Sequence, residues 1–315
     1  MSHPLCPDAD FIAIFKQYGP AGTAKRLGMN ERAVHKRRTR IEKRHGIQIP
    51  APHSRNTRVG SEHPGRICLD LQAGVVLIGG DGHYWPGIVS TAHRAFVKFC
   101  KTLKPQIVVM NGDAFDGATI SRHPPIGWEN RPSVIEEMEA VQERLGEIEK
   151  AAFKARKIWP LGNHDARFET RLATVAPEYA RVHGFHLKDH LPLWESCWSC
   201  WINDEVVIKH RGPKGGVHAV HNNTMAAGKT MVTNHLHSLK VTPYTDYNDT
   251  RFGVDCGTLA DPDGPQFLDY SEDNFKNHRS GFVVLTFRGG KLMWPEVVAV
   301  VDQETVQFRG GLIKV

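Results

Sequence analysis

The sequence has 315 residues, of which 40% are hydrophobic and 23% charged, and this balance excludes a disordered or low-complexity chain. No apolar run reaches the ~18 residues that a membrane span needs, and residues 1–10 lack the apolar core of a signal peptide. The cysteines lie mostly in apolar runs, which indicates buried thiols in a reducing compartment rather than a disulfide framework. We therefore expect a cytoplasmic protein without a membrane partner.

Positive charge is concentrated at the amino-terminal end of the chain. Residues 1–45 contain ten Lys and Arg but four Asp and Glu, which accounts for the whole formal net charge of +6. Residues 46–315 are therefore neutral overall. A basic segment attached to a neutral one indicates a module with a polyanionic partner.

The basic segment is expected to form three helices. Apolar residues between 11 and 15 give the first helix its buried stripe, and Tyr18-Gly19-Pro20 ends it. The short second helix is expected to face inward with Ala21, Ala24 and Leu27. Gly28 supplies the next turn, and Asn30 can cap a third helix that begins at Glu31.

The third helix has Val34 and Ile41 on one face. Its other faces carry Arg32, His35, Lys36, Arg37, Arg38, Arg40, Lys43 and Arg44. This layout resembles a helix-turn-helix DNA-binding unit, most closely over residues 24–34. The resemblance implies that residues 1–45 bind DNA through these eight side chains, and that the protein could be a homodimer. The alternative is a basic helical pair that only covers a core or aids solubility.

The rest of the chain is predicted to be a linker, residues 46–66, followed by one α/β domain, residues 67–315. The linker is rich in Pro and Gly and has no apolar period. Helices are expected at 91–103 and 133–157, and strands at 75–78, 107–110, 158–161, 206–208, 281–287 and 294–301, with the part after residue 205 mostly strands. This order predicts an α/β sandwich with its sheets inside and its helices outside.

Polar clusters follow five of the apolar runs. They are Asp81-Gly82-His83, Gly112-Asp113-Ala114-Phe115-Asp116, Gly162-Asn163-His164-Asp165, the single His210, and Asn234-His235-Leu236-His237. Ligands of α/β sheets bind beyond the carboxyl ends of strands, where these clusters lie. Residues two apart in an extended segment point the same way, so Asp81 could converge with His83, and His235 with His237.

The side chains in these clusters suit a metal centre. A carboxylate such as Asp113 can bridge two cations, and Asn163 offers a neutral oxygen. Mixed imidazole and oxygen ligands favour manganese, with Zn, Fe, Ni or Mg as alternatives, over Ca²⁺. The glycines beside the ligands allow sharp turns at the strand ends.

The five clusters, in this order over residues 75–260, resemble the motifs of the calcineurin-like metallophosphoesterase family. The resemblance implies a four-layer α-β-β-α sandwich and two divalent metal ions. Asp81, His83, Asp113 and His237 would hold one ion. Asp113, Asn163, His210 and His235 would hold the other. One departure is Asn234, which stands where the family usually has Gly.

The resemblance also implies two-metal hydrolysis of a phosphate ester. His164 would stabilise the transition state or protonate the leaving oxygen, Asp165 would orient His164, and Asp116 would support the ligands from outside. Further candidates for substrate contact are Arg122, His123, Arg167, His218 and His221. The remaining histidines, His278 among them, receive no role.

Three functions remain open on the sequence. The first is a metal-dependent phosphodiesterase that cuts DNA, a nuclease tethered by its basic module. The second is a phosphatase for a small molecule or a phosphoprotein. The third is a DNA-binding regulator with an inactive phosphoesterase domain. The basic helix favours the first over the second, and the complete ligand set opposes the third. A helix-turn-helix joined to a phosphoesterase would suit a phage or bacterial enzyme.

Overall fold

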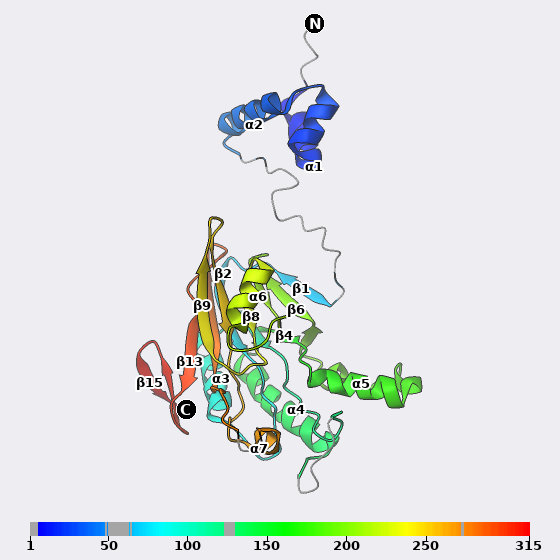
Figure 1. The fold of residues 1–315 in the computed structure, drawn as a ribbon, viewed down its shortest axis with the longest axis vertical. Coiled ribbons are helices and arrows are strands. Elements are labelled where there is room, and N and C mark those ends of the chain that lie inside the picture. Colours follow the sequence, from blue (N-terminus) through cyan, green and yellow to red (C-terminus); the bar gives the residue numbers. More distant parts are fainter. Residues whose placement is uncertain (1–5, 48, 50–62, 64, 123–129, 272–273) are drawn as a thin grey trace. The chain divides into compact units, whose positions relative to one another are not determined.

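The computed structural model describes residues 6–47, 49, 63, 65–122, 130–271 and 274–315 (Figure 1). The chain divides into two compact units, residues 1–64 and 65–315. Most of the expected linker, residues 48, 50–62 and 64, lies outside the described part. No helix among the described residues is both long and apolar enough to cross a membrane.

The amino-terminal unit contains α1 (Asp8–Leu27) and α2 (Glu31–His45). α1 is broken where the sequence predicts, because Gly19 has a left-handed φ of 65° and Pro20 follows it. In the second half of α1, Thr23 and Ala24 are buried but Ala21 is exposed, so the expected inward position of Ala21 is wrong. The buried face of this half contains Thr23 and Ala24, so it is rotated from the face that the sequence predicted.

α2 begins at the predicted cap. The Asn30 side chain accepts a hydrogen bond of 2.8 Å from the backbone N–H of Ala33. Gly28 ends α1 in the left-handed conformation. Buried Val34 and Ile41 of α2 meet Phe11 and Phe15 of α1 in a small apolar core. The apolar stripes of the two helices therefore form the core of this unit.

The second unit contains two sheets. The larger has the strand order β15-β14-β13-β11-β2-β3-β4-β5, with β12 paired to β11. Its strands are β2 (Ala73–Gly79), β3 (Ile107–Met110), β4 (Arg156–Pro160), β5 (Glu195–Cys197), β11 (Gly281–Arg288), β12 (Lys291–Leu292), β13 (Glu296–Val300), β14 (Thr305–Phe308) and β15 (Gly311–Lys314). β2 to β5 are parallel neighbours, so their carboxyl ends lie at one edge.

The smaller sheet has the order β1-β6-β7-β8-β10-β9. Its strands are β1 (Arg66–Leu69), β6 (Ser199–Ile202), β7 (Val206–Ile208), β8 (Thr230–Thr233), β9 (Lys240–Thr245) and β10 (Thr250–Asp255). β7 and β8 are parallel, so the segments that follow them also start at one edge. The chain passes from the larger sheet to the smaller one between Cys197 and Ser199.

The two sheets pack face to face with helices outside them. Val76 and Ile78 of β2 contribute to a core with Ile208, Val232 and other residues of the smaller sheet. The alternate residue Leu77 joins a second core with α3 (Thr91–Leu103) and α4 (Val134–Ala151). α6 (Ala219–Ala227) contacts β8, β9 and β10 (Figure 1). The predicted α/β sandwich with outer helices is therefore confirmed.

One predicted boundary is wrong. α4 ends at Ala151, not at residue 157, because Arg156 and Lys157 already pair with β3. The part after residue 205 is mostly strands, as predicted, and it also includes α6 and α7 (Pro265–Ser271). A further helix, α5 (Asp165–Val175), follows β4, and short 3-10 turns follow at Pro177–Tyr179 and Leu187–His190.

Candidate metal centre

All five polar clusters follow strands, from both sheets. Asp81 and His83 follow β2, Asp113 follows β3, and Asn163 follows β4. His210 follows β7, and His235 and His237 follow β8. Hydrogen bonds join the loops to one another: Asp81 N–H donates to Gly112 O at 2.9 Å, and His235 N–H donates to Asp81 Oδ2 at 2.8 Å. Packing of the two sheets therefore assembles one site from distant segments.

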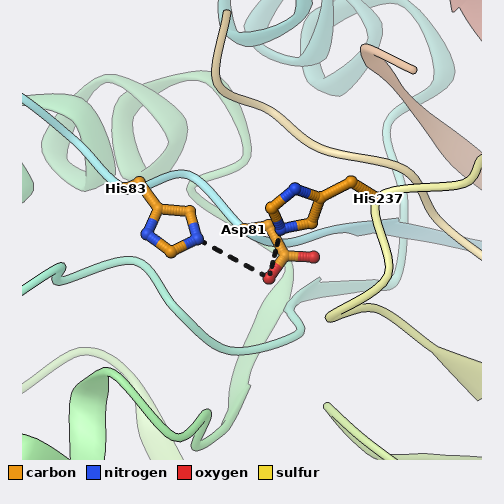
Figure 2. Close-up of side chains that lie close together, drawn as sticks. All are labelled: Asp81, His83 and His237. Atoms are coloured by element: carbon orange, nitrogen blue, oxygen red, sulfur yellow. Dashed lines mark ion pairs between the residues drawn. The ribbon is translucent and has the colours of Figure 1, made fainter. Parts of the chain in front are cut away.

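One group of possible metal ligands is Asp81, His83 and His237. Figure 2 shows both imidazoles turned toward the Asp81 carboxylate. His237 Nε2 lies 3.4 Å and His83 Nε2 3.9 Å from Asp81 Oδ1. All three residues are buried. One cation could therefore contact an oxygen and two nitrogens here.

A second group is Asp113, His210 and His235. His210 Nε2 lies 3.1 Å from Asp113 Oδ2, while His210 Nδ1 lies 2.9 Å from the carbonyl oxygen of Asn111. His210 Nδ1 is also 3.9 Å from Asp81 Oδ1, so the two groups adjoin. The grouping corrects the spacing argument for His235 and His237, which belong to different groups. The two groups divide His83 and His237 from His210 and His235 as the resemblance implies, but Asn163 is in neither group and Asp113 is in one only. The role of these residues as ligands stays a prediction.

Within the described part of the chain, four buried atoms of these side chains have no hydrogen-bond partner. They are Asp81 Oδ1, His83 Nε2, Asn163 Oδ1 and His210 Nε2. His210 Nε2 is close to Asp113 Oδ2 but is not in hydrogen-bond geometry with it. Leaving a buried polar group unsatisfied costs about 1–3 kcal/mol. Cations bound among these oxygens and nitrogens would satisfy them, so the donor set fits a metal centre.

Left-handed backbone, not extended strand, makes the ligands converge. The φ angles are 49° at Asp81, 36° at His83 and 50° at Asp113. They are 76° at His235 and 52° at His237. The expectation of an extended Asp-x-His segment is therefore wrong. Non-glycine residues rarely adopt this region, and such strain is typically found at functional sites.

Two glycines allow the loops to approach closely. A Cβ added to Gly112 would lie 2.4 Å from His210 Nδ1, and Gly112 also has a left-handed φ of 83°. A Cβ added to Gly162 would lie 1.9 Å from Asp113 Oδ1. Any larger residue at either position would push a candidate ligand out of place.

Charge within the site favours ionised carboxylates. Burial by itself raises the pKa of Asp81, but His237 and His210 outweigh it and lower the pKa to about 2. Burial likewise opposes ionisation of Asp113, whose pKa His210 holds well below its usual range. Burial lowers the pKa of His210, yet Asp113 and Asp81 raise it to about 10. The carboxylates therefore attract positive charge, which bound cations would supply.

His164 is held by Asp116 and Arg167. Its Nδ1 lies 2.9 Å from Asp116 Oδ1, which also lies 2.7 Å from His83 Nδ1. Its Nε2 lies 3.2 Å from an Arg167 nitrogen, and Arg167 donates to Asp116 O at 2.9 Å. Burial alone lowers the pKa of His164, but Asp116 and Asp113 raise it. Asp116 therefore orients both His83 and His164.

The predicted role of Asp165 in orienting His164 is wrong. Asp165 Oδ2 accepts hydrogen bonds of 2.8 Å from the N–H groups of Asp113 and Gly162, and Oδ1 accepts one of 3.1 Å from Phe115. Burial raises the pKa of Asp165 to about 6, and Asp113 adds to the effect. Asp165 is thus a buried brace that joins the loops after β3 and β4.

Asn234 is a second brace. It is buried, its Oδ1 accepts a hydrogen bond of 2.9 Å from Asn111, and its Nδ2 donates one of 2.9 Å to Gly257 O. A Cβ added to Gly80 would lie 2.8 Å from this amide. Asn234 therefore joins the loop after β8 to the loops that contain Asn111 and Gly257.

Two residues near the site had no predicted role. His278 Nδ1 lies 3.4 Å from His237 Nδ1, and the ring of Phe267 packs against both imidazoles. Buried Glu137 of α4 accepts hydrogen bonds from the N–H groups of Gly117 and Ala118, at 2.6 and 2.9 Å. Neither residue belongs to a motif, so no sequence signal identifies it.

The substrate candidates have different surroundings. Arg167 is half-buried beside His164, as described above, whereas Arg122 and His218 are exposed. The His221 ring packs against Tyr244, with ring centroids 5.6 Å apart. His123 lies outside the described residues.

The eight predicted DNA contacts on α2 fall into two sets. Arg37 and Arg44 pair with Asp8, and Arg38 pairs with Glu42, at 3.5, 3.0 and 2.9 Å respectively. The exposed remainder is Arg32, His35, Lys36, Arg40 and Lys43, which lie opposite buried Val34 and Ile41. Positions 32, 36, 40 and 43 share one helical face.

Comparisons with known proteins do not identify the family of this chain. No family model and no curated protein matches the chain. One similar solved structure is Yfce, a phosphoesterase from E. coli, with 15% identity over 70% of this chain and 97% of that chain and a TM-score of 0.34. Another is a protein serine/threonine phosphatase from Saccharomyces cerevisiae with similarity to human phosphatase PP5, with 10% identity over 76% and 85% of the two chains and a TM-score of 0.36. At such TM-scores neither structure carries an argument about this chain.

Proposed function

We propose that this chain is a metal-dependent phosphoesterase of the calcineurin-like type, and that it hydrolyses phosphodiester bonds in DNA. One observation carries the proposal: five sequence motifs converge in a buried site. There, Asp81 Oδ1, His83 Nε2, Asn163 Oδ1 and His210 Nε2 have no hydrogen-bond partner among the residues that the structure describes. Asp81, His83, Asp113 and His237 would hold one ion. Asp113, Asn163, His210 and His235 would hold the second.

The bound ions would supply Lewis acidity toward the phosphoryl group and would lower the pKa of water, for which manganese is our first choice. The protein side chains have separate tasks. Asp116 holds the His164 ring at Nδ1, and the Arg167 guanidinium lies beside both residues, 3.2 Å from His164 Nε2 and 2.9 Å from Asp116 O. From there Arg167 would bind a phosphoryl oxygen, and His164 would stabilise it or protonate the leaving oxygen.

DNA as the substrate rests on the amino-terminal unit. The exposed face of α2, with Arg32, Lys36, Arg40 and Lys43, would neutralise phosphates of a duplex. This unit would hold DNA near the metal centre and raise its local concentration. A helix-turn-helix mode of binding, and dimer formation, are part of this proposal.

The test is a substrate panel with metal-stripped protein reloaded with Mn²⁺, Zn²⁺, Fe²⁺, Ni²⁺ or Mg²⁺. Duplex DNA, single-stranded DNA, a small phosphodiester and a small phosphomonoester are assayed in parallel, and bound metal is measured by mass spectrometry. We expect two metal ions per chain and hydrolysis of both DNA and the small diester. Turnover of the monoester alone would make the chain a phosphatase. Absence of any turnover with bound metal would favour a DNA-binding regulator.

A further inference from the structure

The loop from Arg211 to His218 connects a candidate metal ligand to α6. It starts directly after His210 and reads Arg211-Gly212-Pro213-Lys214-Gly215-Gly216-Val217-His218. Residues 209–218 contain three Lys and Arg and no Asp or Glu, within a part of the chain, residues 46–315, that is neutral overall. Local positive charge therefore lies beside the site, which the net charge of this part conceals.

The cations of this segment are available to a ligand. Lys209, Arg211 and Lys214 are exposed. Across the described part of the chain, none of the three forms an ion pair with an acidic side chain. By contrast, Lys229 at the other end of α6 is paired with Asp204 at 3.2 Å.

The loop is held in one conformation despite its glycines. The side chain of buried Asn223 accepts a hydrogen bond of 2.9 Å from Lys214 N–H and donates one of 3.2 Å to Lys214 O. A Cβ added to Gly212 would lie 2.3 Å from Asn223 Cγ, so the approach requires glycine there. At the far end, Lys240 Nζ donates to Val217 O at 2.8 Å. Such anchoring lowers the entropy lost when the loop binds a ligand.

The loop lies within reach of the candidate metal centre. Arg211 is the chain neighbour of His210, so their Cα atoms are ~3.8 Å apart, and Lys214 is at most ~14 Å from His210. Phosphates of one DNA strand recur every ~3.4 Å along the helix axis. These distances are within the span of a few nucleotides of a strand that has one phosphate at the candidate metal centre.

We propose that the loop of residues 211–218 binds the backbone of a nucleic acid substrate, with Arg211 and Lys214 contacting phosphates that flank the bond to be hydrolysed. This inference rests on the proposed phosphodiesterase function and adds a binding surface in the second unit to the one in α2. A nucleic acid is favoured over a phosphopeptide because it repeats its charge along the strand, and the segment presents several unpaired cations in sequence.

The test compares two double variants of the full chain. Arg211→Glu/Lys214→Glu reverses the proposed contacts. The control, Lys101→Glu/Lys150→Glu, reverses two exposed cations on α3 and α4, which cover the other sheet. For each protein, kcat/KM is measured with a single-stranded oligonucleotide and with bis-p-nitrophenyl phosphate. Oligonucleotide affinity of the metal-stripped protein is measured against salt concentration.

We expect the loop variant to lower the ratio of kcat/KM for the oligonucleotide to kcat/KM for the small diester about tenfold. The slope of log affinity against log salt concentration should become shallower by about 1.4, because each of the two phosphate contacts on a single strand contributes ~0.7. The control should keep the ratio and the slope of the parent protein. A loop variant that behaves like the control would overturn the inference. So would an equal loss on both substrates, which would mean that the loop shapes the metal centre. If the parent protein hydrolyses nothing, the proposed function fails, while the salt slope still tests the loop.

Discussion

Asp113 occupies a central position among the candidate ligands. Its Oδ2 is 3.1 Å from His210 Nε2, and its Oδ1 accepts a hydrogen bond of 2.8 Å from His164 N–H. Its own N–H is held by Asp165, and His83 N–H donates to its carbonyl oxygen at 2.9 Å. A change at this one carboxylate therefore affects its own ligand group and the backbone that carries His164.

The variant Asp113→Ala tests the bridging role. We expect its hydrolysis of a small phosphodiester to fall at least about a thousandfold, because it would lose the carboxylate shared by both ions. DNA affinity should stay within about twofold of the parent protein, since the proposed DNA contacts lie elsewhere. Steady-state kinetics and fluorescence anisotropy measure the two properties, with exposed Glu139→Ala as control. Retained turnover would refute the bridging role.

His278 provides a second test at the residue scale. Its Nδ1, 3.4 Å from His237 Nδ1, would orient the imidazole whose Nε2 faces Asp81. Residues that orient a ligand in this way change metal affinity by about 10–100-fold. We expect a loss of this size in His278→Ala, measured by competition with a chelator, and none in the exposed His183→Ala. Equal affinities in the two variants would show that His278 only packs beside the site.

At the scale of elements, the strand ends combine tight turns with buried braces. The loop after β3 turns at Gly112 and is held by Asp165 and by Glu137. Burial and the charge of Asp116 raise the pKa of Glu137 to about 7. This carboxyl group accepts hydrogen bonds from backbone N–H groups of the loop. Rigidity of the loop comes from α4 and α5 as well as from β3.

Substitution of glycine by alanine should have opposite effects on stability at a turn beside the candidate metal centre and at a position inside a helix. Gly112→Ala places a Cβ against the His210 ring at a left-handed φ, and should destabilise the protein by about 1–3 kcal/mol. Gly146, inside α4, has no atom within 4 Å of the added Cβ, so Gly146→Ala should stabilise by about 0.5–1 kcal/mol. Urea-induced unfolding measures both changes. Equal effects would mean that the contact with His210 is relieved by a shift of the loop.

At the scale of the whole molecule, two units have different tasks in the proposed function. Residues 1–64 have a small core of two helices and carry the excess charge. Residues 65–315 contain both sheets and the candidate metal ligands. Each unit has its own apolar core, so each is expected to respond separately to changes in its ligands.

Metal removal should affect only the second unit. A ligand at one hundred times its Kd stabilises the native state by about 2.7 kcal/mol. We expect chelation to lower the melting temperature of the transition that involves residues 65–315 and to leave the transition of residues 1–64 in place. Differential scanning calorimetry with and without excess Mn²⁺ measures this. If the melting temperature of the second unit is the same with and without metal, the proposed metal centre is contradicted.

Deletion of residues 1–45 tests the tether. The truncated chain should bind duplex DNA more weakly than the full chain. Its slope of log affinity against log salt concentration should be shallower by about 0.9 for each phosphate that residues 1–45 neutralise in the full chain. Its turnover of a small phosphodiester should match that of the full chain. An unchanged slope would show that the basic unit does not contact DNA.

The local sequence was sufficient to predict the position of several helices, strands and turns. Helix 91–103 and strand 107–110 are found at the predicted residues, because their apolar periods match those of a helix covering one face and of a strand buried on both. The cap at Asn30 and the break at Gly19 follow from the chemistry of single residues. The five polar motifs could be identified in order for the same reason: each is short and local.

Tertiary structure alone decided how these parts combine. It placed His235 and His237 in different ligand groups, gave the contact with His164 to Asp116 instead of Asp165, and brought His278 beside His237. It also buried Asn234 and engaged Arg37 and Arg44 of α2 in ion pairs with Asp8 of α1. These outcomes depend on left-handed turns and on contacts between segments far apart in the chain, which periodicity and spacing do not encode. The sequence by itself determined which ligand types are present and in what order, and packing of the two sheets decided which of them meet.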